Sequence, residues 1–124
     1  MARKSVGYFE GTDSRLLTAL VLAGYDTIPL SNGVDNHGMY VGRLNNENKT
    51  DILIGYPHKI TAQPDDDLQI HDLFHICKTY EIPLLLEVPE HLQERVWGML
   101  PDAPDLVFML DPADTLDRAL ELLS

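Results

Sequence analysis

A chain of 124 residues that is 44% hydrophobic and 23% charged has the length and composition of one globular domain, so residues 1–124 are expected to form a single domain. The formal net charge of −11 argues against binding to nucleic acid and favours solubility and basic partners. No apolar run approaches the roughly 18 residues of a membrane span, no signal peptide is expected, and one cysteine cannot form an internal disulfide; a cytoplasmic protein with no membrane segment is therefore predicted.

The first β/α unit has clear signals at both ends of its helix. Residues 6–9 predict a strand, and Asp13 or Thr12 can cap the helix that follows. Gly24 is a typical C-terminal stop. The apolar residues at helical spacing are Leu16, Leu17, Leu20 and Val21.

The second unit is less regular. Residues 25–30 predict a strand, and Ser31-Asn32-Gly33 forms the turn after it. Residues 34–48 are expected to hold a helix that is short or frayed, because Gly38 and Gly42 each cost about 1 kcal/mol relative to alanine.

The third unit contains the most apolar strand pattern. Residues 52–54 are Ile, Leu and Ile without alternation, which indicates a strand buried on both faces. Pro57 ends this strand, and residues 58–67 predict a loop that is longer than the roughly 2–6 residues usual in α/β folds. Asp67 can cap the next helix, whose apolar stripe is Ile70, Leu73, Phe74, Cys77 and Tyr80.

The last two units follow the same plan. Residues 82–88 predict a buried strand, and Pro89 opens a helix that runs to about residue 100. The inner face of this helix is predicted to be Leu92, Val96, Met99 and Leu100. Residues 105–110 predict the fifth strand, and Asp111 caps a final helix. The inward residues of that helix are Leu116, Ala119, Leu120 and Leu123.

Five alternating strands and helices predict a three-layer α/β fold. The expected architecture is a doubly wound, five-stranded parallel sheet of the flavodoxin-like type, with strand order 2-1-3-4-5. Ligands bind at the carboxyl edge of such sheets. The polar residues expected there are Glu10, Asp13, Tyr56, His58, Lys59, Glu87 and Asp111. They would perform acid–base or metal chemistry, or they would cap the following helices; we favour capping, because no motif fixes their spacing.

The chain resembles a response-regulator receiver domain over nearly its whole length. The resemblance rests on segments at four strands or turns and at the last helix: Ala23-Gly-Tyr-Asp-Thr-Ile28, Ser31-Asn-Gly33, Thr50-Asp-Ile-Leu-Ile54, Ile82-Pro-Leu-Leu-Leu86 and Asp111-Pro-Ala-Asp-Thr-Leu-Asp-Arg-Ala-Leu-Glu-Leu-Leu123. These are positions that determine the fold, so the resemblance implies a receiver-like architecture.

The working residues of receivers are replaced in this sequence. The phosphate-accepting aspartate falls on Tyr56, the hydroxyl residue after the fourth strand on Val88, and the lysine after the fifth strand on Asp111. The acidic pair after the first strand is reduced to Glu10 beside Gly11. The resemblance therefore implies a non-catalytic pseudo-receiver, a signalling or interaction module that binds a protein partner or a second copy through its last two helices and last strand.

A second resemblance is local and concerns methylglyoxal synthase. It rests on Val41-Gly-Arg-Leu-Asn-Asn-Glu-Asn-Lys-Thr-Asp-Ile-Leu-Ile54, on Pro64-Asp-Asp-Asp67 and on Glu81-Ile-Pro83. The catalytic aspartate and histidine of that family fall near Gly38 and Asp65. This resemblance implies a small phosphorylated ligand, bound in the crevice near Ser31-Asn32-Gly33 and His58, as an alternative function.

The remaining chemical groups have ordinary interpretations. His71 and His75 are one helical turn apart, but two ligands on a solvent face specify little, and we expect surface histidines. Cys77 lies on an apolar stripe and predicts a buried thiol. Trp97 and Arg95 are predicted interface residues, since tryptophan and arginine anchor protein contacts; the alternative for a single tryptophan at helical spacing is a packed core position. No cofactor and no metal site are predicted.

Overall fold

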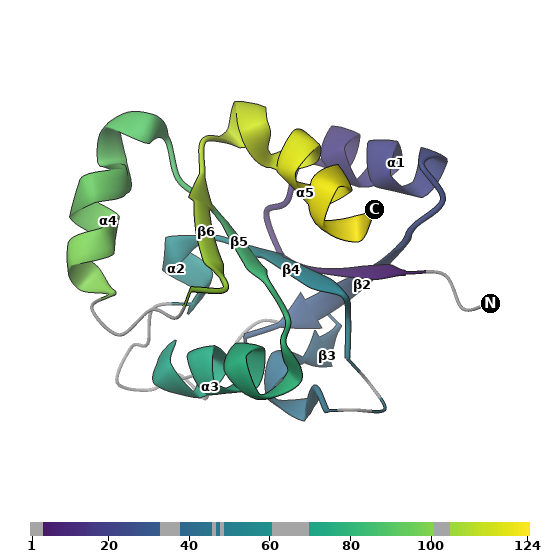
Figure 1. The fold of residues 1–124 in the computed structure, drawn as a ribbon, viewed down its shortest axis with the longest axis horizontal. Coiled ribbons are helices and arrows are strands. Elements are labelled where there is room, and N and C mark those ends of the chain that lie inside the picture. Colours follow the sequence, from purple (N-terminus) through teal and green to yellow (C-terminus); the bar gives the residue numbers. More distant parts are fainter. Residues whose placement is uncertain (1–3, 33–37, 46, 48, 61–69, 101–104) are drawn as a thin grey trace.

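The computed structural model describes residues 4–32, 38–45, 47, 49–60, 70–100 and 105–124. Within these ranges the chain forms a parallel sheet that is flanked by helices on both faces (Figure 1). None of the helices in the described ranges has the length and apolarity needed to cross a membrane.

Six strands make up the described sheet, and all neighbouring pairs are parallel. Their order is β3-β2-β1-β4-β5-β6. The strands are β1 (Ser5–Phe9), β2 (Asp26–Ser31), β3 (Met39–Tyr40), β4 (Ile52–Gly55), β5 (Leu84–Glu87) and β6 (Val107–Leu110). The helices are α1 (Ser14–Leu22), α2 (Pro57–Ile60), α3 (Ile70–Tyr80), α4 (Gln93–Met99) and α5 (Thr115–Leu123), with 3-10 turns η1 (Val41–Arg43), η2 (Glu90–Leu92) and η3 (Pro112–Asp114).

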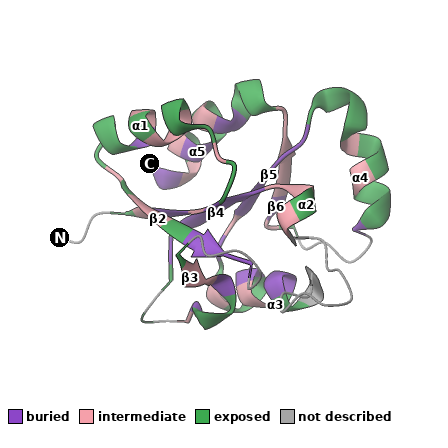
Figure 2. Cartoon of the chain, turned by 180° about the vertical axis from the view of Figure 1, so that it is seen from behind, coloured by how far each residue is buried: buried purple, intermediate pink, exposed green. Residues whose placement is uncertain are grey.

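Two hydrophobic cores lie on the two faces of the sheet. Ile52 and Ile54 of β4 face the core beneath α1 and α5, whereas Leu53 faces the core beneath α3 and η1. All four residues of β4 and all four of β5 are buried, so the prediction of two doubly buried strands is confirmed (Figure 2). Burying a side chain such as that of Leu53 stabilises the fold by about 1.5–3 kcal/mol.

The number of predicted strands is wrong. Where the structure describes residues 34–48, they contain β3 and the turn η1 in place of the expected helix. Gly38 explains the difference: its φ is +103°, and a Cβ there would lie 2.4 Å from the carbonyl oxygen of Pro29. This close approach places β3 beside β2, so the sheet has a sixth strand outside the five that were expected.

Two helices depart from their sequence patterns. Residues 58–60 were expected in a loop but belong to α2, because Pro57 supplies the φ of a first helical residue. In the α4 region Leu100 is buried, but Leu92 is 36% and Met99 60% exposed, so the predicted inner face is half wrong. Leu92 belongs to the separate turn η2, which breaks the helical periodicity on which that prediction depended.

The ends of α1 and the inner face of α5 form as predicted. The Oδ1 atom of Asp13 accepts a hydrogen bond of 2.8 Å from the backbone N–H of Arg15, and Gly24, with φ of +100°, follows the end of α1. In α5, Ala119 and Leu123 are buried beneath the sheet.

Gly7 provides a test of the packing around β1. A Cβ at Gly7 would lie 2.5 Å from Leu30 Cδ1 and 2.9 Å from Leu53 Cδ2. Gly7→Ala should therefore lower the free energy of unfolding by about 1–3 kcal/mol through overpacking. Gly98→Ala is the control: nothing lies within 4 Å of its added Cβ, and alanine in a helix should raise stability by about 0.5–1 kcal/mol. Urea unfolding measures both, and an unchanged Gly7→Ala variant would contradict the described register.

Candidate functional site

The carboxyl edge of the sheet holds a buried carboxylate. Glu87 ends β5 and is only 7% exposed. Its Oε1 atom accepts a hydrogen bond of 2.9 Å from the hydroxyl of Tyr56, which follows β4, and its Oε2 atom accepts one of 3.0 Å from the hydroxyl of Thr115 at the start of α5. Because burial of an unpaired carboxylate is costly, these two neutral donors are what allows Glu87 to lie inside. We call Tyr56, Glu87 and Thr115 the Glu87 cluster.

Tyr56 is held in its protonated form. Burial of its ring raises the pKa of Tyr56 to about 12, and the neighbouring Glu87 carboxylate acts in the same direction because it repels a phenolate. A hydrogen bond with Thr12 opposes this shift but is outweighed. At neutral pH the side chain is therefore protonated and serves as a hydrogen-bond donor.

Lys59 links the ends of the first two strands to α2. Its ammonium group lies 3.0 Å from Oε2 of Glu10, which follows β1. Its backbone carbonyl accepts a hydrogen bond of 3.2 Å from the side-chain amide of Asn32, which follows β2. Ser31 and Asn32 are both buried, and Gly33 of the predicted phosphate turn lies outside the described residues. Glu10 and Lys59, which were both expected at this edge, are thus brought together as a salt bridge.

Two of the strand-end acids cap helical turns. Asp13 caps α1, and Asp111 accepts hydrogen bonds of 3.1 Å from the backbone N–H groups of Ala113 and Glu90. This is the role that the capping interpretation predicted for acids at these positions. His58 is exposed, and its ring centroid lies 5.8 Å from that of Tyr56.

The remaining candidate nucleophile and metal ligands lie on α3, away from the Glu87 cluster. Cys77 is buried, and burial raises the pKa of its thiol to about 12. His75 is exposed on α3, while the side chain of His71 lies outside the described residues. In the part of the chain that the structure describes, no group of three or more His, Cys, Asp or Glu side chains is arranged to hold a metal ion.

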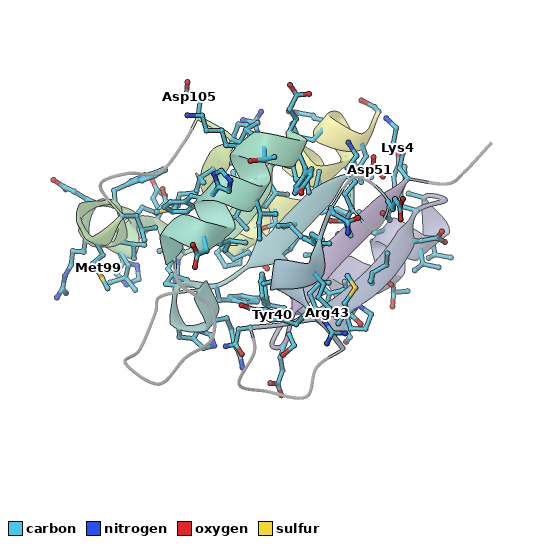
Figure 3. The ribbon with its side chains drawn as sticks, turned by 90° about the horizontal axis from the view of Figure 1, so that it is seen from below. Lys4, Tyr40, Arg43, Asp51, Met99 and Asp105 are labelled. Carbon is cyan, nitrogen blue, oxygen red and sulfur yellow. The ribbon has the colours of Figure 1, made fainter. Side chains whose placement is uncertain are left out.

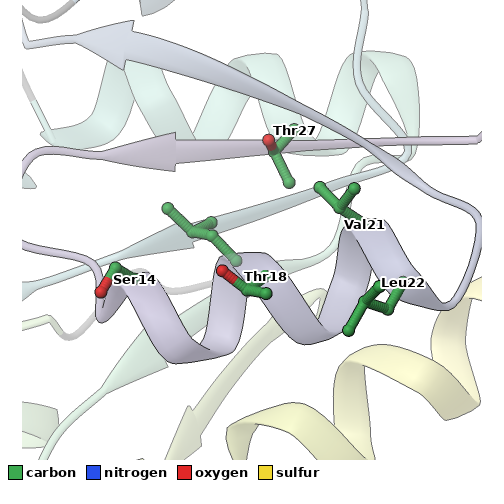
Figure 4. A pocket seen from close by; sticks show the side chains of 6 residues that line it. Ser14, Thr18, Val21, Leu22 and Thr27 are labelled. Carbon is green, nitrogen blue, oxygen red and sulfur yellow. The ribbon is translucent and has the colours of Figure 1, made fainter.

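A groove lies away from this edge, between α1 and β2 (Figure 4). Its volume is about 340 Å³. The lining residues are Ser14, Leu17, Thr18, Val21, Leu22 and Thr27. None of them is charged, so the groove offers apolar contact and hydroxyl groups.

The chain matches no protein-family model and no curated protein sequence.

Sequence reasoning found most of the carboxyl edge but missed Thr115. The position of Glu87 and Tyr56 at the ends of neighbouring strands predicted that they would lie close together, and they do. Thr115 comes from the first turn of α5, and its distance from Glu87 depends on how that helix crosses the sheet. A hydroxyl residue four positions after Asp111 was the available signal.

Titration of Tyr56 tests the Glu87 cluster. The phenolate absorbance that Tyr56→Phe removes from the wild-type spectrum should appear near pH 12, where an ordinary tyrosine would titrate near pH 10. Because the folded-state pKa is raised, the stability that Tyr56 contributes is complete below about pH 10 and is lost as the pH rises to about 12. Ultraviolet difference titration and urea unfolding measure the two effects. A Tyr56 transition at pH 10 in the folded protein would refute the described environment.

Proposed function

We propose that this chain is a non-catalytic interaction module, a receiver-like signalling domain that binds another protein through α4 and the neighbouring edge of the sheet. The observation that carries the proposal is the exposed apolar surface of α4. The state of the carboxyl edge supports the non-catalytic part.

The polar groups at the carboxyl edge are occupied by one another. Tyr56 stands where a receiver would carry its phosphate-accepting aspartate, and its hydroxyl donates to Glu87. Lys59 is neutralised by Glu10. Covalent phosphorylation by the receiver chemistry requires a carboxylate nucleophile at the position of Tyr56. The described contacts therefore favour a structural role for this edge.

The exposed apolar surface lies at the opposite end of the molecule from the starts of β1 and β4. We define the α4 surface as Leu92, Arg95, Trp97 and Met99. No residue of α4 is buried, and the Trp97 side chain is 39% exposed. Figure 3 shows Met99 at this end, away from Lys4 and Asp51. Exposed aromatic, apolar and arginine side chains on one short segment are typical of the anchors of protein interfaces.

None of the described contacts specifically supports the alternative function, binding of a small phosphorylated ligand. The side-chain amide of Asn32 donates to the carbonyl of Lys59, and the Lys59 ammonium contacts Glu10. A phosphate bound beside Ser31 would compete with both contacts. We therefore keep protein binding as the proposal.

Incubation with acetyl phosphate and Mg²⁺ is expected to leave the mass of the protein unchanged, because Tyr56 provides a hydroxyl with raised pKa in place of a carboxylate. Intact-mass spectrometry measures this, with a phosphorylatable receiver domain as the positive control. A stoichiometric adduct that hydroxylamine removes would overturn the pseudo-receiver interpretation.

Trp97→Glu is expected to abolish protein binding and to keep the domain folded, since the Trp97 ring is partly exposed and outside both cores. Leu22→Glu is the matched control: Leu22 is 83% exposed on α1 and also places a carboxylate on an apolar surface. Cross-linking and affinity capture from an extract of the source cells should recover proteins with wild type and Leu22→Glu that Trp97→Glu does not retain. Circular dichroism verifies folding. Equal capture by all three proteins, or a loss only with Leu22→Glu, would contradict the proposal.

A further inference from the structure

The outer side of β6 carries unpaired backbone groups among the residues that the structure describes, since the strand order ends at β6. The carbonyl oxygens of Leu106 and Leu110 accept hydrogen bonds of 2.9 and 2.8 Å from the N–H groups of β5 and of the residue after it. Peptide groups alternate in direction along a strand, so those of Val107 and Met109 point outward. These two residues present a row of donors and acceptors to a further strand.

The two edges of the sheet differ in how they are protected. On the other edge, Pro29 of β2 has no N–H group, and β3 covers the end of β2 with only two residues. Proline and very short strands are the usual means of preventing edge pairing. In contrast, β6 reads Val-Phe-Met-Leu, with no proline and no charge, and three of its four side chains are only half-buried. The β6 edge therefore lacks the features that protect the other edge from pairing with a further strand.

Acidic side chains surround both ends of β6. Asp105 precedes the strand and is exposed, and Asp111 follows it. Asp111 binds the N–H of Glu90, which brings the exposed Glu90 to the same end of the strand. The basic side chain that contacts β6 is Arg118, 5.7 Å above the Phe108 ring, and it is already paired with Glu121 at 3.1 Å. An incoming strand with basic flanks would complement this charge.

We propose that β6 accepts an extended, basic segment of a partner protein as an added strand. The inference rests on the proposed function, because it gives the chemistry of the partner and the backbone edge that receives it. Backbone hydrogen bonds to Val107 and Met109 would supply affinity, and lysine or arginine residues beside Asp105 and Asp111 would supply selectivity.

A second copy of this chain fits the edge less well. The antiparallel register that is centred on Phe108 engages both outward-facing residues, Val107 and Met109. The same register sets Asp105 opposite Asp111 of the second copy at both ends of the pair. Like charges directly opposite each other destabilise a strand pair. Self-pairing is therefore an outcome of the test, and the basic segment is the proposal.

The test uses two synthetic peptides and the full chain labelled with ¹⁵N. One peptide is Lys-Lys-Val-Thr-Val-Thr-Val-Lys-Lys, and the other has glutamate at every lysine position. The basic peptide should bind at least about tenfold more tightly than the acidic one, and added salt should weaken its binding. The amide resonances of Val107 and Met109 should shift, and the hydrogen exchange of both amides should slow.

Two charge variants, one beside β6 and one distant from it in the sequence, test the selectivity. Asp105→Lys should weaken the basic peptide about fivefold or more, whereas Glu47→Lys, which changes the net charge equally in the segment between η1 and β4, should change it less than about twofold. Equal binding of both peptides, no binding, or amide shifts away from β6 would overturn the inference. Protected Val107 and Met109 amides in a dimer without peptide would overturn it in favour of a second copy. Capture that depends on Trp97 but occurs without peptide binding would refute only this inference and leave the interaction module standing.

Discussion

Burial of β4 and β5 on both faces is the constraint on which the rest of this structure depends. A strand that is apolar on both sides needs a helical layer above it and another below it, so the chain must cross the sheet alternately. Because all neighbouring strands of the described sheet are parallel, their carboxyl ends meet at the same edge. This is why Tyr56, Glu87, Glu10 and Lys59, which are far apart in the sequence, meet in two contacts at that edge.

The sequence predicted those parts of the fold that local patterns control. The runs at residues 52–54 and 84–86, the cap at Asp13 and the inner face of α5 follow from hydrophobicity and helix chemistry within a few residues. The failures depend on contacts between distant segments. β3 forms because Gly38 approaches the backbone of Pro29, which no pattern in residues 34–48 encodes. Leu92 was wrongly assigned to the inner face of α4 because the helical periodicity was counted from Pro89. Leu92 lies in the turn η2, before α4 begins.

The candidate site was predictable to a similar degree. Because Tyr56, Glu87 and Lys59 follow or end strands, the sequence predicted that they lie at the same edge of the sheet. Their contacts depend on the strand order and on how α5 crosses the sheet, which brings Thr115 to Glu87. At this edge a carboxylate accepts from two hydroxyls, and an ammonium group lies beside a second carboxylate, so these contacts hold helices and strands together.

The position of Trp97 determines which part of this protein its tryptophan fluorescence reports on. Trp97 is its only tryptophan, and it lies on a helix that contributes no buried residue. Indole emission therefore records the surroundings of α4, while the two cores on either side of the sheet are silent at that wavelength. Fraying of α4 would shift the emission even if both cores remained intact, and an unfolding curve followed by fluorescence would then begin earlier than one followed by far-ultraviolet circular dichroism. The same property makes the indole a built-in reporter, since anything that covers α4 changes the environment of one chromophore alone.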